Sequence, residues 1–111
     1  MESTYEACLL HELGLRGLPF ERQKAIDVRY KGIVVDCGYR LDVLVAGRIL
    51  LELKSVERLL PIHSAQLITY LKLADLPIGL LVNFNVRVLK DGLRRLWLHD
   101  SNFSSSRLPV T

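Results

Sequence analysis

The sequence predicts an α/β domain in which a central mixed sheet of four to five strands is flanked by helices. Short apolar stretches of strand length dominate the middle of the chain, and one helical stretch separates two of them. Tight turns between the earlier strands favour antiparallel hairpins, whereas a helix between two strands permits a parallel crossover, which should be right-handed. We therefore expect a sheet that contains both kinds of strand pairing.

The first helix is expected over residues 2–15, which no proline interrupts. Its apolar positions follow helical spacing, and they are Tyr5, Cys8, Leu9 and Leu13. Gly14 and Gly17 mark its end. The two cysteines, Cys8 and Cys37, are expected to be reduced and at least half-buried, because one pair is weak evidence for a disulfide.

Alternation of apolar and polar residues predicts a strand within residues 20–30, followed by a tight turn at Lys31-Gly32. Three further strands are then expected over residues 33–37, 39–45 and 48–54, the last two joined around Ala46-Gly47. Each is short and rich in apolar residues, as strands of a small domain are.

The second helix is expected to begin near His63 or Ser64, after Pro61 stops the chain, and to run to about Ala74. Ser64 is a candidate N-cap, and His63 is expected to cap the helix rather than act in catalysis. The apolar run 78–84 is typical of a central strand covered on both faces. Residues 93–98, with Trp97, are expected to form an edge strand, through which a homodimer is one alternative.

Length and composition predict one domain over residues 1–100 and a flexible polar tail over residues 101–111. No apolar run approaches the roughly 20 residues of a membrane span, and no signal peptide is evident, so we expect a cytoplasmic protein without membrane contact. The net charge of +3 favours an anionic partner only mildly. Basic residues gather late in the chain, either as a solvated face or as a phosphate-contacting patch: Arg87, Lys90, Arg94 and Arg95.

Asp42, Glu52 and Lys54 are the candidate catalytic residues, because they are charged groups within apolar strands. Strand alternation puts Glu52 and Lys54 on one face. Two carboxylates that meet repel each other, and Mg²⁺ or Mn²⁺ held by Asp42 and Glu52 would remove that repulsion. A two-residue turn would place Asp42 opposite Leu51, whereas a three-residue loop centred on Gly47 would place it opposite Glu52. An alternative is a structural salt bridge between Lys54 and either carboxylate.

The run Leu41-Asp42-Val43 through Leu51-Glu52-Leu53-Lys54-Ser55 resembles the core motif of the PD-(D/E)xK nuclease superfamily. Downstream, Gln66 and Tyr70 form a Gln-x-x-x-Tyr pair similar to the helix motif of recombination-type exonucleases in that superfamily. The segments Asn83-Phe84-Asn85 and Leu89-Lys90-Asp91-Gly92, with Glu2-Ser3-Thr4-Tyr5, resemble the small bacterial GxxExxY family. The resemblance runs from residue 2 to about residue 95.

This resemblance implies a restriction-endonuclease-like core and a metal-dependent nuclease that cuts phosphodiester bonds, in DNA rather than RNA. It adds Glu2 as a further candidate metal ligand, and it gives Gln66 and Tyr70 a role in supporting the site or contacting DNA. The alternative for this pair is a half-buried aromatic with an ordinary polar neighbour. The family's Gly, expected three residues before Glu2, is missing, so a second interpretation is a truncated, non-catalytic module that binds nucleic acid or a partner.

Overall fold

The computed structural model describes residues 2–87 and 89–98, apart from the side chains of Glu2, Ser3, Cys37 and Leu89. The predicted polar tail, residues 101–111, lies outside the described residues. The elements in chain order are α1 (Glu2–Leu15), β1 (Phe20–Tyr30), β2 (Ile33–Val45), β3 (Ile49–Lys54), α2 (Pro61–Ala74), β4 (Ile78–Asn83), the 3-10 helix η1 (Leu89–Gly92) and β5 (Leu93–Trp97). No helix in the described ranges has the length and apolar character needed to cross a membrane.

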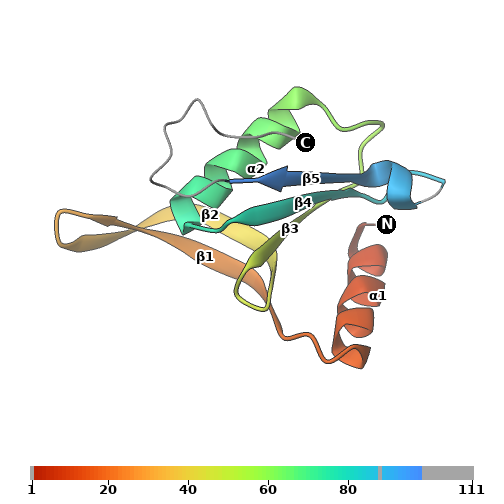
Figure 1. Ribbon diagram of the computed structural model, residues 1–111, viewed down its shortest axis with the longest axis horizontal. Helices are drawn as coiled ribbons and strands as arrows, with labels where there is room; N and C mark the ends of the chain where they lie inside the picture. The colour runs from red at the N-terminus through yellow and green to blue at the C-terminus, as the bar shows by residue number, and fades with distance from the viewer. Residues whose placement is uncertain (1, 88, 99–111) are drawn as a thin grey trace.

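One five-stranded sheet forms the centre of the molecule, with its strands in the order β1-β2-β3-β4-β5 (Figure 1). β3 and β4 are parallel, and α2 makes the crossover between them. The other three pairs of neighbours are antiparallel. The predicted fold class is therefore confirmed: a mixed sheet with flanking helices.

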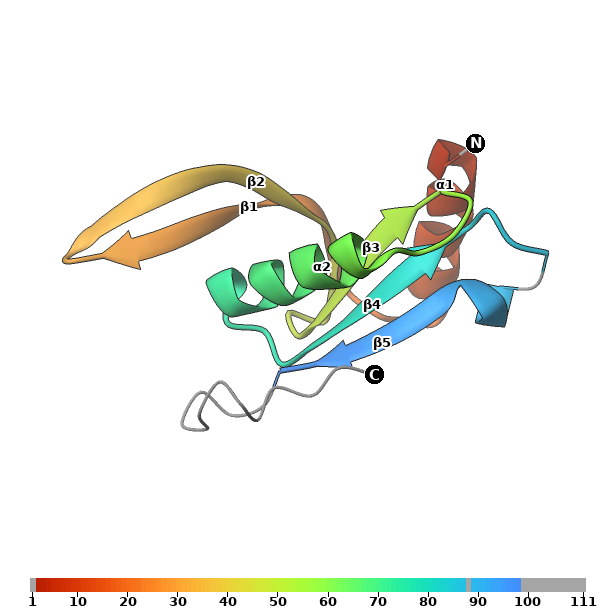
Figure 2. The ribbon, with the colours of Figure 1, turned by 90° about the horizontal axis from the view of Figure 1, so that it is seen from above.

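The two helices cover opposite faces of the sheet (Figures 1 and 2). Leu67 of α2 packs in one cluster with Leu50, whereas Leu13 of α1 packs in the other with Leu51. Because Leu50 and Leu51 are consecutive in β3, their side chains leave the strand on opposite sides. We call these sides the α2 face and the α1 face.

β2 is one continuous strand, so the prediction of two strands divided at Gly38 was wrong. Gly38 has a φ of 81°, which glycine adopts without strain, and its amide donates to the Asp36 carboxylate at 2.8 Å. The pairs Ala25–Arg40 and Asp27–Asp36 leave three β2 residues opposite Ile26 alone. The glycine therefore makes a bulge, which bends the strand without ending it.

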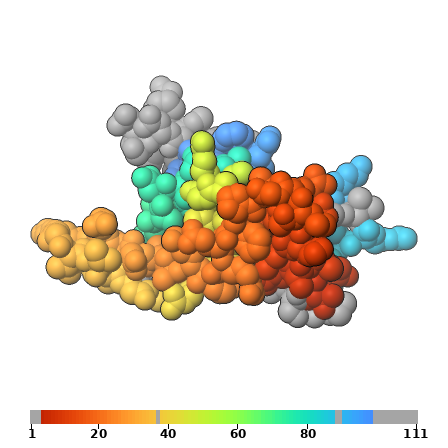
Figure 3. All heavy atoms as spheres, turned by 90° about the horizontal axis from the view of Figure 1, so that it is seen from below, coloured from red at the N-terminus to blue at the C-terminus, as the bar shows by residue number. Residues whose placement is uncertain are grey.

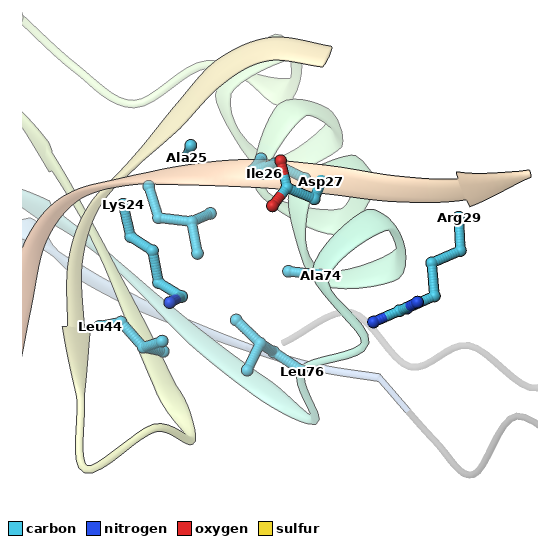
Figure 4. A pocket seen from close by; sticks show the side chains of 9 residues that line it. Lys24, Ala25, Ile26, Asp27, Arg29, Leu44, Ala74 and Leu76 are labelled. Carbon is cyan, nitrogen blue, oxygen red and sulfur yellow. The ribbon is translucent and has the colours of Figure 1, made fainter. Parts of the chain in front are cut away.

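The outer parts of β1 and β2 form an arm that projects beyond the rest of the sheet (Figures 1 to 3). Of the residues of β2 that the structure describes, only 43–45 pair with β3. The part of β2 that lies in the arm therefore pairs with β1 alone, and the arm is a two-stranded ribbon. A hollow of about 280 Å³ lies between its base and the end of α2, lined by residues such as Lys24, Ile26 and Leu76 (Figure 4). None of the predicted site residues lines this hollow.

Helix α2 begins earlier than predicted, because Pro61 occupies its first turn instead of ending the preceding segment. A proline is tolerated there, since the first amides of a helix have no partner within it. Ser64 is not the N-cap: it is buried and accepts a hydrogen bond from Arg94 at 3.2 Å. His63 caps the helix as predicted, because its Nδ1 accepts the amide of Leu60 at 2.9 Å.

Two smaller expectations are also settled. β5 occupies an edge of the sheet, as predicted, and Trp97 there is 42% exposed. Cys8 is free, as expected, but it is exposed, so the expectation that its thiol is at least half-buried was wrong. It lies on α1, whose inward positions are taken by larger apolar side chains such as Leu13. The Cys37 side chain lies outside the described residues.

Candidate active site

The connection between β2 and β3 sets the register of the candidate catalytic residues. Val45 pairs with Ile49, so the loop has three residues and is centred on Gly47. Ala46 and Gly47 both have positive φ values, 53° and 66°, which reverse the chain tightly. Continued by one step beyond the pair Val43–Leu51, this register places Asp42 opposite Glu52. The chain thus adopts the register that brings the two carboxylates together, not the one that pairs Asp42 with Leu51.

β2 and β3 separate where these carboxylates lie. Their last Cα pair is Val43–Leu51, although β3 continues to Lys54. Side chains take over the hydrogen bonds there: the Leu53 amide donates to Oδ2 of Asp42 at 2.8 Å, and the Asp42 amide donates to Oε1 of Glu52 at 3.4 Å. Each carboxylate is therefore held by the backbone of the other strand. We call this point, where β2 and β3 separate beside Asp42 and Glu52, the fork.

Strand alternation directs the three charged side chains toward α2. Leu44 and Leu50 pack in the cluster on the α2 face. Asp42 lies two residues before Leu44, while Glu52 and Lys54 lie two and four residues after Leu50, so all three share that face. Glu52 is only 5% exposed, and Asp42 and Lys54 are half-buried.

Helix α2 brings the predicted Gln-x-x-x-Tyr pair to the same place. Lys54 Nζ donates to Oε1 of Gln66 at 3.4 Å, and Gln66 Nε2 donates to the Tyr70 hydroxyl at 3.1 Å. Tyr70 is buried, with 8% exposed. A hydrogen-bonded chain therefore leads from the amine of β3 to two residues one helical turn apart on α2.

The electrostatics of Glu52 reflect this crowding. Burial, reinforced by the neighbouring Asp42 carboxylate, raises the pKa of Glu52 from its ordinary value near 4.5 to about 8, although Lys54 opposes the rise. The pKa of Tyr70 is also raised, first by burial and then by the negative charges of Glu52 and Asp42. Without a cation, the two carboxylates therefore resist being ionised together at neutral pH.

The amino-acid sequence that builds this site matches a known family. The model of the PD-(D/E)XK nuclease superfamily matches residues 1–96, which include every residue of the fork. The chain belongs to the PD-(D/E)XK nuclease superfamily. No curated protein and no solved structure matches it. Nucleases of this superfamily act on nucleic acids and typically use divalent metals.

The residues at the fork suit a divalent cation by their chemistry. Carboxylate oxygens are hard donors, and Mg²⁺ is commonly held by one or two carboxylates with water completing its shell. Among the described side chains, no cluster of three or more histidines, cysteines, aspartates and glutamates has the geometry of a metal site. The side chain of Glu2, the further candidate ligand, lies outside the described residues.

The alternative of a structural salt bridge between Lys54 and one of the two carboxylates is not what the structure has at the fork. Within the described part of the chain, Lys54 forms no ion pair with Asp42 or Glu52, and its amine is directed to Gln66. In this PD-(D/E)XK chain the lysine thus remains beside the carboxylates without neutralising either one in a close pair.

Tyr39 joins the site without having been predicted from the sequence. Its ring centroid lies 5.6 Å from that of Tyr70, at an interplanar angle of 43°, and its side chain is 51% exposed. It stands on the arm, directly after the bulge at Gly38. Tyr39 and Tyr70 lie in different elements, so neither helical nor strand periodicity in the sequence could predict their contact.

The late basic residues do not form the single patch that one alternative required. Arg94 and Arg95 are neighbours in β5, so alternation sends them to opposite faces. Arg94 turns toward Ser64, while the Arg95 guanidinium lies 5.2 Å from the centre of the Trp97 ring. Lys90 and Arg87 are exposed outside the strand.

Proposed function

We propose that this PD-(D/E)XK chain is a divalent-metal-dependent nuclease of the GxxExxY type that hydrolyses phosphodiester bonds in DNA. One observation carries the proposal: Asp42 and Glu52 are fixed side by side at the fork, and the pKa of Glu52 is raised to about 8. Such a pair costs stability when both members are ionised, and a divalent cation relieves that cost.

Asp42 and Glu52 are the residues that would hold Mg²⁺ or Mn²⁺. Hydrogen bonds from the backbone fix one oxygen of each carboxylate, and each carboxylate retains further lone pairs for a cation. A bound divalent ion supplies a Lewis acid for the scissile phosphate and lowers the pKa of a water molecule. The protein contributes the fixed positions of the oxygens.

Lys54 would stabilise the negative charge that develops on the phosphoryl oxygens, or orient the attacking water. Its side chain extends from β3, and its amine donates a hydrogen bond to Gln66 on α2. Tyr70 fixes Gln66 in turn, so the α2 pair acts as a positioning device for the amine. Preorganisation of this kind lowers the barrier because little has to move during the reaction.

The GxxExxY assignment is supported by the motifs that this sequence carries and by the place of one of them. Asn83, in the Asn-Phe-Asn motif, is 2% exposed and exchanges hydrogen bonds with the backbone of Val56 at 3.0 and 2.9 Å. It thereby holds the segment that follows Lys54. The choice of DNA over RNA rests on the resemblance to recombination-type exonucleases.

A cleavage assay tests the proposal. The full chain is incubated with single- and double-stranded DNA and RNA, with Mg²⁺ or Mn²⁺ and, separately, with EDTA. We expect metal-dependent cleavage that Asp42→Asn abolishes. If no substrate is cut and neither metal shifts the melting temperature, the chain is instead a binding module of the same fold.

A further inference from the structure

A second feature lies at the same end of the sheet, on the α1 face. A pocket of about 480 Å³ opens between α1 and the segment that follows β4. Figure 3 shows that segment, in light blue, beside the red helix. We call it the α1 pocket; its lining includes Tyr5, Leu9, Glu12, Phe84, Val86 and Arg87.

Aromatic rings form part of the α1 pocket's lining. The rings of Tyr5 and Phe84 are stacked, with centroids 5.2 Å apart and planes at 16°. Phe84 is half-buried against the α1-face cluster, whereas Tyr5 remains 42% exposed. An exposed ring already backed by another ring is a rigid platform for a flat aromatic ligand.

The α1 pocket adjoins the strand end that carries Lys54. Lys54 and Asn83 form the last pair between the parallel strands β3 and β4, and Phe84 is the next residue of the chain. The Phe84 amide donates to the Lys54 carbonyl at 2.9 Å, so the stacked pair of rings lies next to the backbone of Lys54. Lys54 itself faces α2, while the rings lie on the α1 face. A chain that contacts both must pass round the end of the sheet, which a flexible single strand can do and a stiff duplex cannot.

Charge in the α1 pocket favours an anionic ligand. Glu12 is already paired with Arg16 at 2.7 Å. Arg87, by contrast, forms no ion pair with any carboxylate that the structure describes. Its exposed guanidinium is therefore free to contact a phosphate next to a stacked base.

We propose that the α1 pocket binds an unpaired nucleobase of the substrate, with Tyr5 as the stacking surface and Arg87 as the phosphate contact. This rests on the proposed nuclease function, and it names the substrate class: single-stranded nucleic acid, or a duplex end that has frayed. Base–aromatic stacking tolerates any sequence, because every base has a π-face.

The test uses oligonucleotides that carry the fluorescent base 2-aminopurine, whose emission falls when it stacks. Binding to the full chain is measured with Mg²⁺ in a Glu52→Gln background, where cleavage does not interfere. We expect quenching at one position of a single strand. Tyr5→Ala should remove that quenching and weaken single-strand binding about 5- to 150-fold, the range for one stacked base.

Matched variants keep the test specific. Tyr5→Phe keeps the ring and should bind as the parent does, and Tyr30→Ala removes an exposed tyrosine on the arm and should change nothing. Arg87→Gln, a surface change that spares the fold, should weaken binding and flatten its salt dependence, unlike Arg48→Gln in the β2–β3 loop.

The outcomes separate the two proposals. If Tyr5→Ala and Arg87→Gln bind and quench like the parent while Asp42→Asn abolishes cleavage, the base pocket is refuted and the nuclease stands. Equal losses on single strands and duplexes would also refute it. If the Glu52→Gln chain with no further change quenches 2-aminopurine but the wild-type chain never cleaves, the nuclease proposal fails and the pocket stands. Absence of both binding and cleavage removes both.

Discussion

The backbone amide of Asp42 points at the carboxylate of Glu52, 3.4 Å from its Oε1, at the point where their two strands separate. The Asp42 carboxylate in turn accepts the next amide of β3, that of Leu53. The two acids are therefore linked both by charge and by the backbone, so that a change in the ionisation of one alters the other.

The stability of the metal-free protein should fall as pH rises. Glu52 has a pKa of about 8 in the folded chain against about 4.5 when unfolded, so between these values only the folded state keeps the proton. The free energy of unfolding should therefore drop by roughly 3 to 5 kcal/mol from pH 4.5 to pH 8 and level off above it. Urea denaturation in EDTA at several pH values measures this. Glu52→Gln should flatten the profile, whereas Glu57→Gln, at an exposed carboxylate, should leave it unchanged.

Isosteric changes at the fork should separate catalysis from folding. Asp42→Asn and Glu52→Gln keep the shape of the side chains and remove the charges that would hold the ion. Each should abolish cleavage and the thermal stabilisation by Mg²⁺, while the metal-free variants melt at or above the wild-type temperature at pH 8, because repulsion is relieved. Cleavage that survives both changes would remove these residues from the metal site.

Lys54→Ala should slow cleavage by roughly 100-fold or more while Mg²⁺ still raises the melting temperature, because the amine acts on the phosphate and not on the ion. Lys72→Ala, an exposed lysine of the same helix that carries Gln66, serves as the control and should cut normally. If Mg²⁺ no longer raises the melting temperature of Lys54→Ala, the lysine instead keeps the two carboxylates in the positions that bind the ion.

The α2 pair should act through Lys54. Tyr70→Phe removes the hydroxyl that accepts from Gln66 and should lower the cleavage rate roughly tenfold, with a stability cost of about 1 kcal/mol. Tyr30→Phe on the exposed arm is the matched change and should have neither effect. If Tyr70→Phe is fully active, Tyr70 is only a packed core residue.

Gly92 should be indispensable for the fold. A Cβ at this position would lie 2.1 Å from the carbonyl oxygen of Asn83, a backbone atom that cannot move without disturbing β4. Gly92→Ala should therefore destabilise the chain by about 2 kcal/mol or more. Gly14→Ala meets nothing within 4 Å and lies in α1, so it should stabilise by about 0.5 to 1 kcal/mol. Thermal or urea denaturation compares them.

Local patterns in the sequence were sufficient for most of the elements. Helical spacing placed α1, and alternation placed β1, because side-chain periodicity is written directly in the order of the residues. The break predicted at Gly38 shows the limit of such reasoning. A glycine signals only that the chain bends, and the pairing of β1 across it decided that β2 continues.

The candidate site followed the same division. The spacing of Asp42, Glu52 and Lys54 and the motif around them suggested the three residues, but two registers remained open. The structure has the three-residue loop, which pairs Val45 with Ile49. The register of two strands depends on how both of their faces are buried, and that is a property of the whole fold. The contact of Tyr39 with Tyr70, the raised pKa of Glu52 and the α1 pocket are long-range results of packing. They required the tertiary structure because no local period in the sequence encodes which distant side chains meet.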